Sequence, residues 1–273
     1  MTTLSVVIPT THRIDDVMEL ARQIDATSPI PTTVTVVDNG PHATETGWDS
    51  LGRKVIVRDS YLGSEQAFLL GLRCAPKATW YLLLDHDARL YDGTLSILLS
   101  AATGPDAVYS GNQNGDGSSW DRRNGRAPAQ RDLTPKAIRV EFAPWSGLLL
   151  SPGAVEVISS HNSGFFFFWD DYFACWLLRR AGYHIWGVPG AVVENEDLPN
   201  EKLTPWRAYY KARNHILFHN QTGYGGLFEL VLVEGKDLCM AFLGDCRVGR
   251  VRAITQGIVD GIRGRRGPQM LPA

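Results

Sequence analysis

Long apolar runs are missing from this 273-residue sequence, and cysteine is scarce. No uninterrupted apolar stretch approaches the roughly eighteen residues that a membrane-spanning helix needs, so no such helix is predicted. The first residues, MTTLSVVIPT, have no basic flank before their apolar stretch, which argues against a secretory signal. The cysteines form no CxxC pair, so neither a zinc site nor a disulfide scaffold is expected, and a reducing cytoplasm is the expected compartment. They are Cys74, Cys175, Cys239 and Cys246.

The sequence also lacks an excess of basic residues. Lys and Arg number 27 and Asp and Glu 29, which gives a net charge of −2, and a general nucleic-acid binder is therefore not expected. The charge is unevenly distributed, however. Residues 247–273 contain six arginines and one acid, Asp260, for a net charge of +5, whereas residues 1–246 contain 21 basic and 28 acidic residues for −7. The basic excess that an anionic partner requires lies at the C-terminal end.

Strand-like and helix-like patterns alternate through the first third of the chain. Short runs rich in Val, Ile and Leu predict strands, and apolar residues at helical spacing predict helices between them. The run 80–84 is apolar on both faces, as in the centre of a parallel sheet. The predicted strands are 4–8, 33–37, 54–57 and 80–84, and the predicted helices are 15–24 and 65–74. This order predicts an α/β fold with a doubly wound sheet, which binds ligands beyond the carboxyl ends of its strands.

The middle of the chain departs from this alternation. Residues 111–135 are rich in Gly, Asn, Asp, Ser, Arg and Pro, with Trp120 as the only aromatic residue. Such a long segment inside a domain is usually a lid, a binding loop or a disordered segment. The later predicted elements are strands at 137–142 and 147–150, a helix at 171–181 with Gly182 as its C-cap, and mostly helical structure over 206–262.

The most informative motif is Asp85-His86-Asp87, directly after the predicted strand 80–84. Two carboxylates separated by one residue at the carboxyl end of a strand can share a divalent cation and the phosphates bound to it. Their oxygen ligands suit Mn²⁺ or Mg²⁺. A solvated turn that closes the strand is the alternative explanation.

A second pair of acids, Asp170 and Asp171, follows the aromatic run 165–169 and begins a predicted helix. An acid at a helix N-terminus has an ordinary role, because it caps the helix and complements its dipole. That role accounts well for one of the two. Apolar surroundings raise the pKa of a carboxylate and make it a better general base, so the pair is also a catalytic candidate.

A third acidic segment follows the apolar run 190–193. Its oxygen-bearing side chains can supply a further metal or acceptor contact, or they can form a solvated acidic loop, and the sequence favours neither. They are Glu194, Asn195, Glu196 and Asp197.

These motifs occur in an order that resembles family 2 glycosyltransferases of the GT-A fold. The chain is most similar to the branch with bacterial rhamnosyltransferases and galactofuranosyltransferases. Each motif alone is weak, but their order and spacing over roughly residues 4–214 are specific. The motifs are Val7-Ile8-Pro9-Thr10, Val36-Val37-Asp38-Asn39-Gly40, Leu62-Gly63, Gly71-Leu72-Arg73, Leu82-Leu83-Leu84-Asp85-His86-Asp87, Trp169-Asp170-Asp171, Arg180-Ala181-Gly182-Tyr183, Val188-Pro189-Gly190-Ala191-Val192-Val193 and Tyr210-Lys211-Ala212-Arg213-Asn214.

The resemblance implies a Rossmann-like α/β fold in which helices flank a mixed, mostly parallel sheet. It implies a glycosyltransferase domain at residues 1–203, with a nucleotide-sugar half at 1–110 and an acceptor half at 111–203. A C-terminal helical extension is expected at 204–273.

The resemblance also implies roles in binding the nucleotide of the donor. Asp38 matches the acid that contacts the nucleotide base. The loop from Pro9 to Arg13, which includes Thr10, matches the segment that lines the nucleotide pocket, and Gly63 matches a glycine beside the diphosphate.

For the metal, the resemblance implies Mn²⁺ or Mg²⁺ at the diphosphate. Asp85 and Asp87 match the two acids of the motif, with Asp87 as the direct ligand. Asn195 stands where relatives often carry a histidine ligand, and its carbonyl oxygen can still bind a hard cation.

On the acceptor side, Asp171 matches the catalytic base, and Trp169 and Asp170 match residues that line the acceptor site. Trp145 can stack on a sugar ring or pack in the core. The implied reaction is an inverting transfer from a UDP- or dTDP-linked sugar, such as galactofuranose or rhamnose, to a hydroxyl of a glycan or lipid-linked acceptor.

Departures from the family pattern keep two other functions open. Phe173 replaces a second acid, Tyr61 replaces an asparagine, and residues 64–67 replace much of a glycine-rich stretch. A catalytically weak or silent nucleotide-sugar binding module is one alternative. The other is a phosphohydrolase with Asp85 in a nucleophile loop, although such loops normally follow the first strand and do not continue with a residue like Arg89.

The C-terminal arginines suggest a membrane partner. An amphipathic helix with arginines and an apolar stripe of Ile254, Ile258 and Ile262 can lie on an anionic membrane surface, where lipid-linked acceptors reside. The protein is then expected at the inner face of the membrane as a peripheral protein. A helix that docks on its own domain, with a solvated basic end, is the alternative.

Overall fold

A computed structural model describes residues 1–40, 48, 51, 53–58, 60–113, 137–195, 204–243 and 248–270. Much of the predicted loop 111–135, with Trp120, lies outside the described residues, as do Glu196 and Asp197. The chain divides into two compact units. The first comprises residues 1–62, 66–161 and 174–196, and the second comprises 63–65, 162–173 and 197–273. The domain boundary expected at residue 203 stays a prediction.

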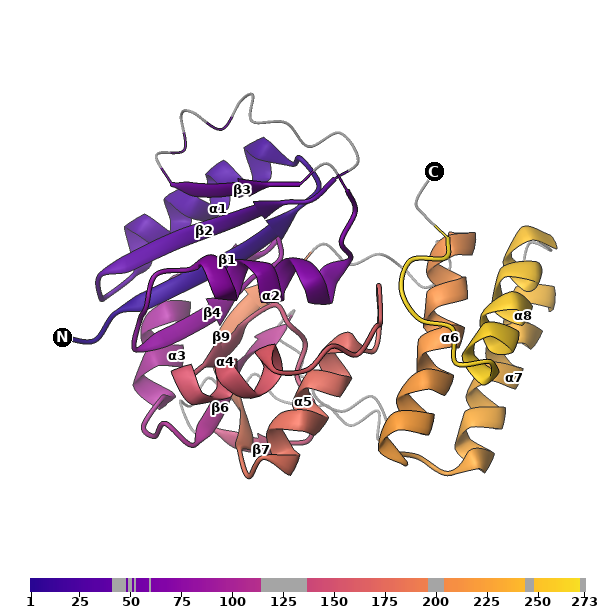
Figure 1. The fold of residues 1–273 in the computed structure, drawn as a ribbon. Helices are drawn as coiled ribbons and strands as arrows, with labels where there is room; N and C mark the ends of the chain where they lie inside the picture. The colour runs from indigo at the N-terminus through magenta and orange to yellow at the C-terminus, as the bar shows by residue number, and fades with distance from the viewer. Residues whose placement is uncertain are drawn as a thin grey trace. The chain divides into compact units, whose positions relative to one another are not determined.

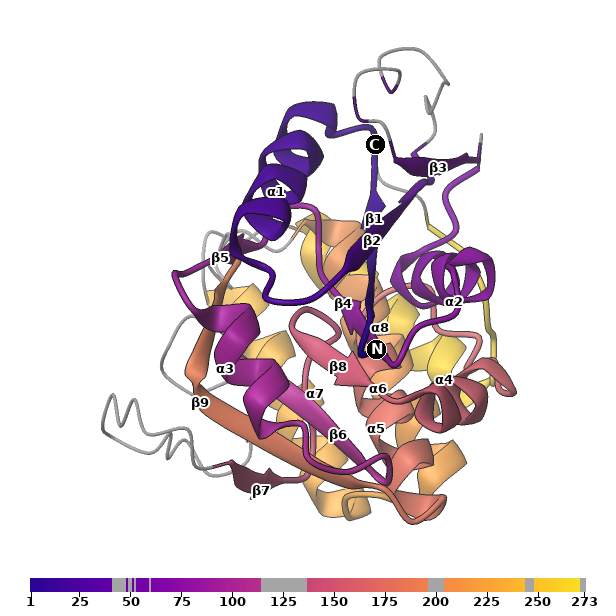
Figure 2. The same ribbon diagram turned by 90° about the vertical axis from the view of Figure 1, so that its left-hand side faces the viewer.

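The first unit is built on one mixed sheet, shown in Figures 1 and 2. Within the described residues it has nine strands in the order β3-β2-β1-β4-β8-β6-β9-β5, and β7 pairs with β9. The strands are β1 (Leu4–Thr10), β2 (Thr32–Asp38), β3 (Lys54–Val57), β4 (Trp80–Leu83), β5 (Arg89–Leu90), β6 (Ala107–Gln113), β7 (Ile138–Val140), β8 (Leu148–Leu150) and β9 (His184–Glu194). All run in one direction except β5, β7 and β8, which confirms the predicted mixed, mostly parallel sheet.

The central strand β1 is buried along its whole length, between β2 and β4. Its apolar sequence suits a position covered on both faces. The strands expected at 4–8, 33–37, 54–57, 80–84 and 147–150 are confirmed with small shifts at their ends. Strand β6 and the first half of β9 were not predicted, because Ser110, Gly111, Gly187 and Pro189 interrupt the apolar pattern that identifies a strand.

Helices cover both faces of this sheet (Figure 2). On one face lie α1 (Ile14–Thr27) and α3 (Thr94–Ala101), whose apolar side chains share a core cluster with Val6 and Ile8 of β1. On the other face lie α2 (Ser64–Cys74) and α4 (Pro152–Ser159). Residue 71 of α2 is a glycine, and a Cβ atom there would lie 2.2 Å from Val7 Cγ1. Side chains of β1 point alternately to the two faces of the sheet, and Val7 points toward α2. Val7 therefore limits how closely α2 packs on the sheet.

The second unit contains a three-helix bundle of α6 (Pro205–Thr222), α7 (Leu227–Leu243) and α8 (Val248–Ile262), which confirms the predicted helical region. Helix α6 begins with Pro205 and ends at Gly223, which adopts the left-handed conformation of a C-cap. Helix α8 packs closely on α6 because it presents glycines. A Cβ atom on Gly257 would lie 2.4 Å from the Tyr209 carbonyl oxygen, and one on Gly261 would lie 2.8 Å from the Arg213 carbonyl oxygen. No helix among the described residues is long and apolar enough to cross a membrane.

Tyr209 of α6 and Asp260 of α8 are buried polar residues that contact each other. The Tyr209 hydroxyl donates to Asp260 Oδ2 at 3.0 Å, and Arg265 forms an ion pair with the same carboxylate at 3.0 Å. Burial, together with the hydrogen bond to Asp260, raises the pKa of Tyr209 to about 12. Burial alone would raise the pKa of Asp260, but hydrogen bonds from Gln256 and Tyr209 outweigh it and lower that pKa.

The raised pKa of Tyr209 predicts a loss of stability in alkali. An unfolded tyrosine has a pKa of about 10, so the folded phenol stabilises the bundle fully below pH 10 and loses that contribution as the pH rises toward 12. The free energy of unfolding should fall by up to ~1.4 kcal/mol per pH unit in this window from this group. Urea unfolding followed by circular dichroism at pH 9, 10 and 11 measures it. The Tyr209→Phe variant should lack this part of the slope, and equal slopes in both proteins would contradict the assignment.

Candidate active site

The predicted donor residues of the first unit lie at one edge of the sheet. Thr10 and Asp38 are paired at the ends of β1 and β2, Asp85 follows β4, and Asn195 follows β9. These four strands run in the same direction, so their carboxyl ends meet at this edge. This is the edge where open α/β sheets bind ligands.

Asp38 is fully buried and holds the loop that follows β1. Its Oδ1 accepts a hydrogen bond from the His12 backbone N–H at 2.8 Å. Its Oδ2 lies 2.7 Å from His12 Nδ1 and accepts a hydrogen bond from Trp48 Nε1 at 3.1 Å. His12 has a φ of 65°, in the left-handed region. Asp38 therefore fixes the loop of the predicted nucleotide pocket, and its contact with a nucleotide base stays a prediction.

Thr10 and Arg13 continue this loop into α1. The buried Thr10 hydroxyl oxygen accepts a hydrogen bond from the Arg13 backbone N–H at 3.1 Å. The Arg13 guanidinium is half-exposed and forms an ion pair with Asp16 at 2.7 Å. Pro9 is buried within β1. The positive charge of Arg13 thus stays at the surface beside the carboxyl ends of the strands.

Asp85 and Asn195 are joined through Ser146. The Asp85 backbone N–H donates to Ser146 Oγ at 3.1 Å, and Ser146 Oγ donates to Asn195 Oδ1 at 3.1 Å. Asn195 Nδ2 in turn donates to Asp85 Oδ2 at 3.1 Å. Pairing between Arg89 of β5 and Glu194 of β9 brings the two segments together. The structure therefore unites two predicted site residues that lie 110 positions apart in the sequence.

The other members of the acidic motif differ in their surroundings. Burial is the main cause that lowers the pKa of His86, and the nearby Arg13 also lowers it, while Asp87 and Asp16 act in the opposite direction. Asp87 is half-buried and forms no hydrogen bond or ion pair with any residue that the structure describes. Its role as a metal ligand stays a prediction.

The carboxylates of Asp85 and Asp87 fit a metal that a phosphate group helps to bind. Mg²⁺-type sites commonly use one or two carboxylates and complete their coordination with substrate phosphates and water. The described residues contain no group of three or more His, Cys, Asp and Glu side chains arranged around a metal, so a site built from protein alone is not formed by them. Asn195 directs its Nδ2 atom toward Asp85, and its role as a metal ligand stays a prediction.

Of the residues predicted on the acceptor side, Trp169, Asp170 and Asp171 lie in the second unit, where α5 (Asp170–Arg180) begins. Asp170 is buried, and its carboxylate accepts a hydrogen bond from the Ser64 hydroxyl. Asp171 is half-buried, and its Oδ1 accepts from the Tyr172 backbone N–H at 2.9 Å. Of the two acids, Asp170 thus has a structural partner at the helix N-terminus, and Asp171 is the more accessible.

Trp169 lies against α6. Its indole ring stacks on the His215 imidazole, with centroids 4.2 Å apart and planes 5° from parallel. Its Nε1 donates to the Lys211 carbonyl oxygen at 3.1 Å. His215 Nδ1 lies 2.7 Å from Glu234 Oε1, and both side chains are nearly buried. A carboxylate from α7 therefore orients the imidazole on which Trp169 stacks.

Residues that depart from the family pattern have structural partners of their own. Phe173 is buried against Phe165, with ring centroids 5.7 Å apart. Glu65 is buried and accepts hydrogen bonds from the Ser163 backbone N–H at 2.9 Å and the Ser163 hydroxyl at 2.7 Å. Trp145 is only 6% exposed and packs beside Phe68 at 5.5 Å, which is the core role that the sequence left open.

The sequence reasoning missed Ser64, Ser146 and His215 as contributors to the site. Serine is common in loops and strands, and a single hydroxyl gives no pattern that identifies its partner. His215 follows the motif that ends at Asn214, but its partners Trp169 and Glu234 come from distant segments. No local signal could have found these contacts.

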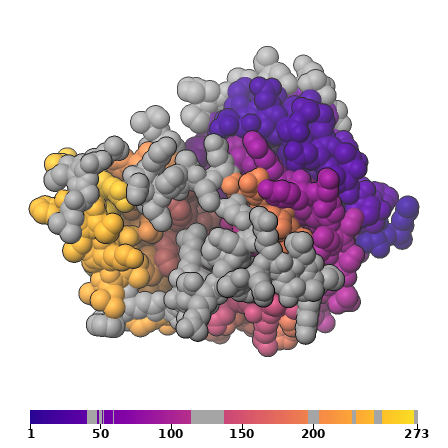
Figure 3. Space-filling view, turned by 180° about the vertical axis from the view of Figure 1, so that it is seen from behind, coloured from indigo at the N-terminus to yellow at the C-terminus, as the bar shows by residue number. Residues whose placement is uncertain are grey.

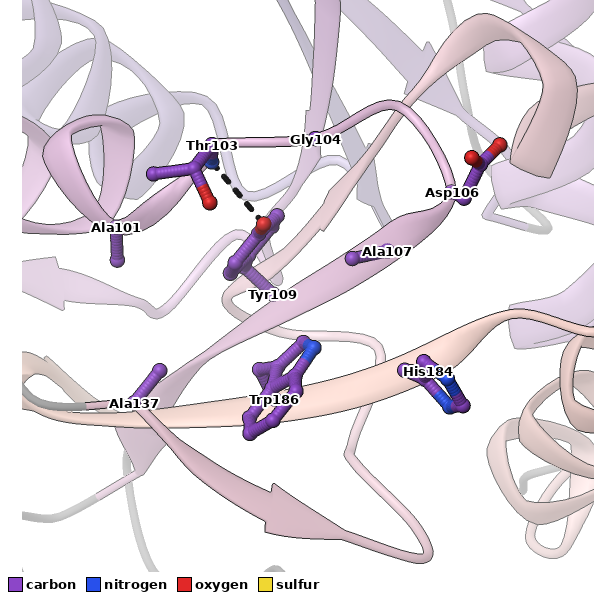
Figure 4. A pocket seen from close by; sticks show the side chains of 9 residues that line it. All are labelled: Ala101, Thr103, Gly104, Asp106, Ala107, Tyr109, Ala137, His184 and Trp186. Carbon is purple, nitrogen blue, oxygen red and sulfur yellow. Dashed lines mark hydrogen bonds between the residues drawn. The ribbon is translucent and has the colours of Figure 1, made fainter.

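A pocket of about 400 Å³ lies at the other end of the sheet, and Figure 4 shows its lining. Trp186, His184 and Tyr109 come from β9 and β6, and the Tyr109 hydroxyl oxygen accepts a hydrogen bond from the Thr103 backbone N–H at 3.0 Å. None of the predicted site residues lines it. His184 lies at the opposite end of β9 from Asn195. The segment His184–Val193 pairs with Ala107–Gln113 of β6, which spans about 20 Å at ~3.3 Å per residue, so this pocket is remote from Asn195.

Comparison with known proteins supports the fold. No protein-family model matches the chain, and no curated protein matches its sequence. Solved structures do match. The mannosyltransferase PcManGT from Pyrobaculum calidifontis, in complex with GDP-Man and Mn²⁺, is 15% identical with a TM-score of 0.59, and the match covers 96% of this chain and 75% of that one. TarS from S. aureus, in complex with UDP-GlcNAc, is 13% identical with a TM-score of 0.58, with 97% and 81% covered.

A third match is GalNAc-T7 with UDP, GalNAc and Mn²⁺, at 14% identity and a TM-score of 0.59. It covers 96% of this chain but 56% of the GalNAc-T7 chain, so the present chain spans a little over half of that protein. The chain has the GT-A fold. At these identities the likeness establishes the architecture, and the expected fold is confirmed.

Gly63 provides a test of the packing that holds the predicted acceptor segment. Its φ is 78°, and a Cβ atom there would lie 2.0 Å from the Phe166 carbonyl oxygen, which also accepts the Ser64 N–H. Gly223 is a matched control, since its φ is 65° but a Cβ atom would meet nothing within 4 Å. Gly223→Ala should cost about 1 kcal/mol from the left-handed conformation. Gly63→Ala should cost a further ~1–3 kcal/mol from the clash.

Urea unfolding of both variants measures the difference. Equal losses in free energy of unfolding would show that residue 63 does not contact the backbone of the 162–173 segment in solution.

Proposed function

We propose that the protein is an inverting glycosyltransferase that uses a nucleoside-diphosphate sugar. The observation that carries this proposal is the GT-A fold together with the acids at its carboxyl edge, where Asp85 is tied to Asn195 and Asp87 has no protein partner among the described residues. The three similar structures hold GDP-Man, UDP with GalNAc, or UDP-GlcNAc. The motif series of the sequence favours a UDP- or dTDP-linked galactofuranose or rhamnose as the donor.

In the proposed binding mode, the nucleotide lies along the loop that follows β1. Arg13 offers an exposed positive charge, and Pro9 and Thr10 shape the pocket wall. A bound Mn²⁺ or Mg²⁺, held by Asp87 and Asp85 with the diphosphate, would supply positive charge opposite the leaving group. The place of Gly63 beside the diphosphate rests on the resemblance alone, because Phe166 occupies the space that a Cβ atom there would take.

In the proposed reaction, a hydroxyl oxygen of the glycan or lipid-linked acceptor forms a bond to the anomeric carbon of the donor sugar. The bond from that carbon to the diphosphate oxygen breaks, and its electron pair leaves with the nucleoside diphosphate. Asp171 takes the proton of the attacking hydroxyl as a general base. Trp169 and Asp170 form the neighbouring wall of the acceptor site. A single attack from the opposite face inverts the anomeric configuration.

A catalytically weak or silent nucleotide-sugar module is the second candidate. It is favoured by Phe173, which is buried in place of a second acid, and by Asn195, whose amide binds Ser146 and Asp85. The phosphohydrolase alternative has less support, since Asp85 follows β4 and not the first strand.

Replacement of Asp171 by Asn tests the proposed function. The Asp171→Asn variant should lose transfer to the acceptor by roughly 10²-fold or more, because the amide cannot accept the proton in the transition state. The measurement is transfer of radiolabelled sugar from a panel of UDP- and dTDP-sugars with Mn²⁺. Asp92→Asn, a change at an exposed acid, is the matched control and should remain active.

Donor binding is measured separately in the same variants by thermal shift. A donor that binds only the folded protein raises its apparent stability, and Asp171→Asn should keep that shift while Asp87→Asn loses the part that depends on Mn²⁺. Undiminished transfer by Asp171→Asn would contradict the role of Asp171. Donor binding without transfer in the native protein would favour the silent module.

We also propose that the bundle docks on an anionic membrane surface. The apolar stripe expected on α8 lies partly inside the bundle, since Ile254 is 3% exposed and packs with Ala208 and Ala212. Helix α7 instead presents large apolar side chains to solvent. Val231, Leu232 and Phe242 are each more than half exposed and lie within about 100° of its circumference.

The bundle also carries exposed arginines. Atoms near the C-terminal end of the chain, in yellow, reach the surface in Figure 3. Arg252 of α8 and Arg263, directly after α8, are exposed. A bundle that exposes both large apolar side chains and arginines suits a membrane interface with anionic lipids. A second copy of the chain fits less well, because it would bring like charges together.

Flotation with phosphatidylserine vesicles tests this partner. The Leu232→Ser/Phe242→Ser variant should lose binding through lost apolar burial. Arg252→Gln/Arg263→Gln should bind about 30-fold more weakly, at ~1 kcal/mol per arginine. Tyr91→Ser, at an exposed aromatic residue of the first unit, is the control. Equal recovery of all variants, or equal binding to neutral vesicles, would remove the membrane proposal.

A further inference from the structure

The backbone immediately before the candidate base is strained. Phe168 and Trp169 have φ values of 64° and 66°, so two consecutive bulky residues adopt the left-handed conformation. In that region the Cβ atom of an L-residue crowds its own backbone, and Gly or Asn is normally found there. The two residues lead directly into Asp170 and Asp171 at the start of α5. Such conformations persist only where the surroundings over-determine them, and they concentrate at functional sites.

Asn214 of α6 supplies the contacts that hold this backbone. Its Nδ2 donates to the Phe167 carbonyl oxygen at 2.6 Å and to the Phe168 carbonyl oxygen at 3.1 Å. One amide group thus uses both of its N–H bonds on consecutive carbonyls of the strained segment. The Trp169 ring is fixed to the same helix by the Lys211 carbonyl oxygen and the His215 ring.

Arg213 fixes the orientation of the Asn214 amide. The Arg213 Nε donates to Asn214 Oδ1 at 2.8 Å, so the oxygen of the amide faces the guanidinium and the nitrogen must face the carbonyls. Arg213 is fully buried and donates from Nη1 to the Gly267 carbonyl oxygen at 2.6 Å. Its guanidinium lies over the Tyr210 ring at 4.6 Å. A buried, immobile arginine therefore sets which way Asn214 points.

We propose that Asn214 is a positioning residue, which holds the left-handed backbone at Phe168 and Trp169 and so sets the placement of Asp171. The inference rests on the proposed function for its kinetic consequence. Its structural part, the hold on residues 167–169, does not depend on the reaction. Asn214 is expected to act on the catalytic step and not on donor affinity, because its Nδ2 atom donates to the segment that carries the candidate base.

The test combines removal of Asn214 with relief of the strain. Asn214→Ala should lower kcat for sugar transfer by about 10- to 100-fold, since displacing a catalytic group by about 1 Å has effects of this size. The donor-dependent thermal shift should be unchanged. Phe168→Gly lowers the conformational energy of a positive φ at residue 168, because glycine has no Cβ atom. In the Asn214→Ala/Phe168→Gly double variant, kcat should recover most of its loss.

Hydrogen–deuterium exchange tests the structural role of Asn214 independently of catalysis. Hydrogen–deuterium exchange should become faster at the amides of residues 168–173 in Asn214→Ala, slow again in the double variant, and remain unchanged in β1 and β4. Gln221→Ala is the matched control, since Gln221 is another α6 carboxamide that donates to a carbonyl of the same segment, that of Ser163, at 3.4 Å. It should alter neither the exchange of 168–173 nor kcat.

The outcomes separate the inference from the proposed function. Unchanged exchange at residues 168–173 in Asn214→Ala would overturn the inference whatever the enzyme does. A fall in kcat that Phe168→Gly does not restore would also overturn it, because the loss would then come from general destabilisation. If exchange responds as expected while Asp171→Asn retains full transfer, the proposed function fails and the hold of Asn214 on the backbone stands.

Discussion

The register of β1 is the constraint on which the first unit depends. Parallel pairing with β2 and β4 aligns Leu4 with both Thr32 and Trp80, so all three strands begin level and end at the same edge. Their apolar side chains are buried on both faces, and a shift of one residue would turn each apolar side chain to the opposite face. The fixed register places Thr10, Asp38 and Asp85 together, although none of these side chains contributes to the apolar core that fixes it.

Much of this arrangement could be predicted from the sequence because it depends on local patterns. Runs such as 54–57 and 80–84 have the composition of buried strands, and the helix that begins near Asp170 has acids at its start and Gly182 after its end. The carboxyl-edge position of Asp38, Asp85 and Asn195 then follows from strand direction alone. The roles of these residues toward a ligand are still predictions.

The remaining features depend on contacts between distant segments, and no local pattern encodes them. Ser146 links Asp85 to Asn195 because β8 runs antiparallel between β4 and β6, which a three-residue strand does not reveal. The left-handed backbone at Phe168 and Trp169 contradicts the preferences of both residues, so local propensity would have predicted the opposite. Tertiary hydrogen bonds outweigh propensity there.

His12 and Trp48 surround Asp38, and under the proposed function this bears on which nucleotide base is bound. Its carboxylate is fully buried and already contacts three nitrogen atoms of the protein, namely the His12 backbone N–H, His12 Nδ1 and Trp48 Nε1. A nucleobase that approaches Asp38 must exchange with one of these donors, so the gain is a difference between two hydrogen bonds and not a whole new one. Discrimination among bases at this position would then depend on the free energy needed to move the His12 loop or the Trp48 ring away from Asp38. In that case, the rigidity of the loop around His12 would influence base selectivity as much as Asp38 itself does.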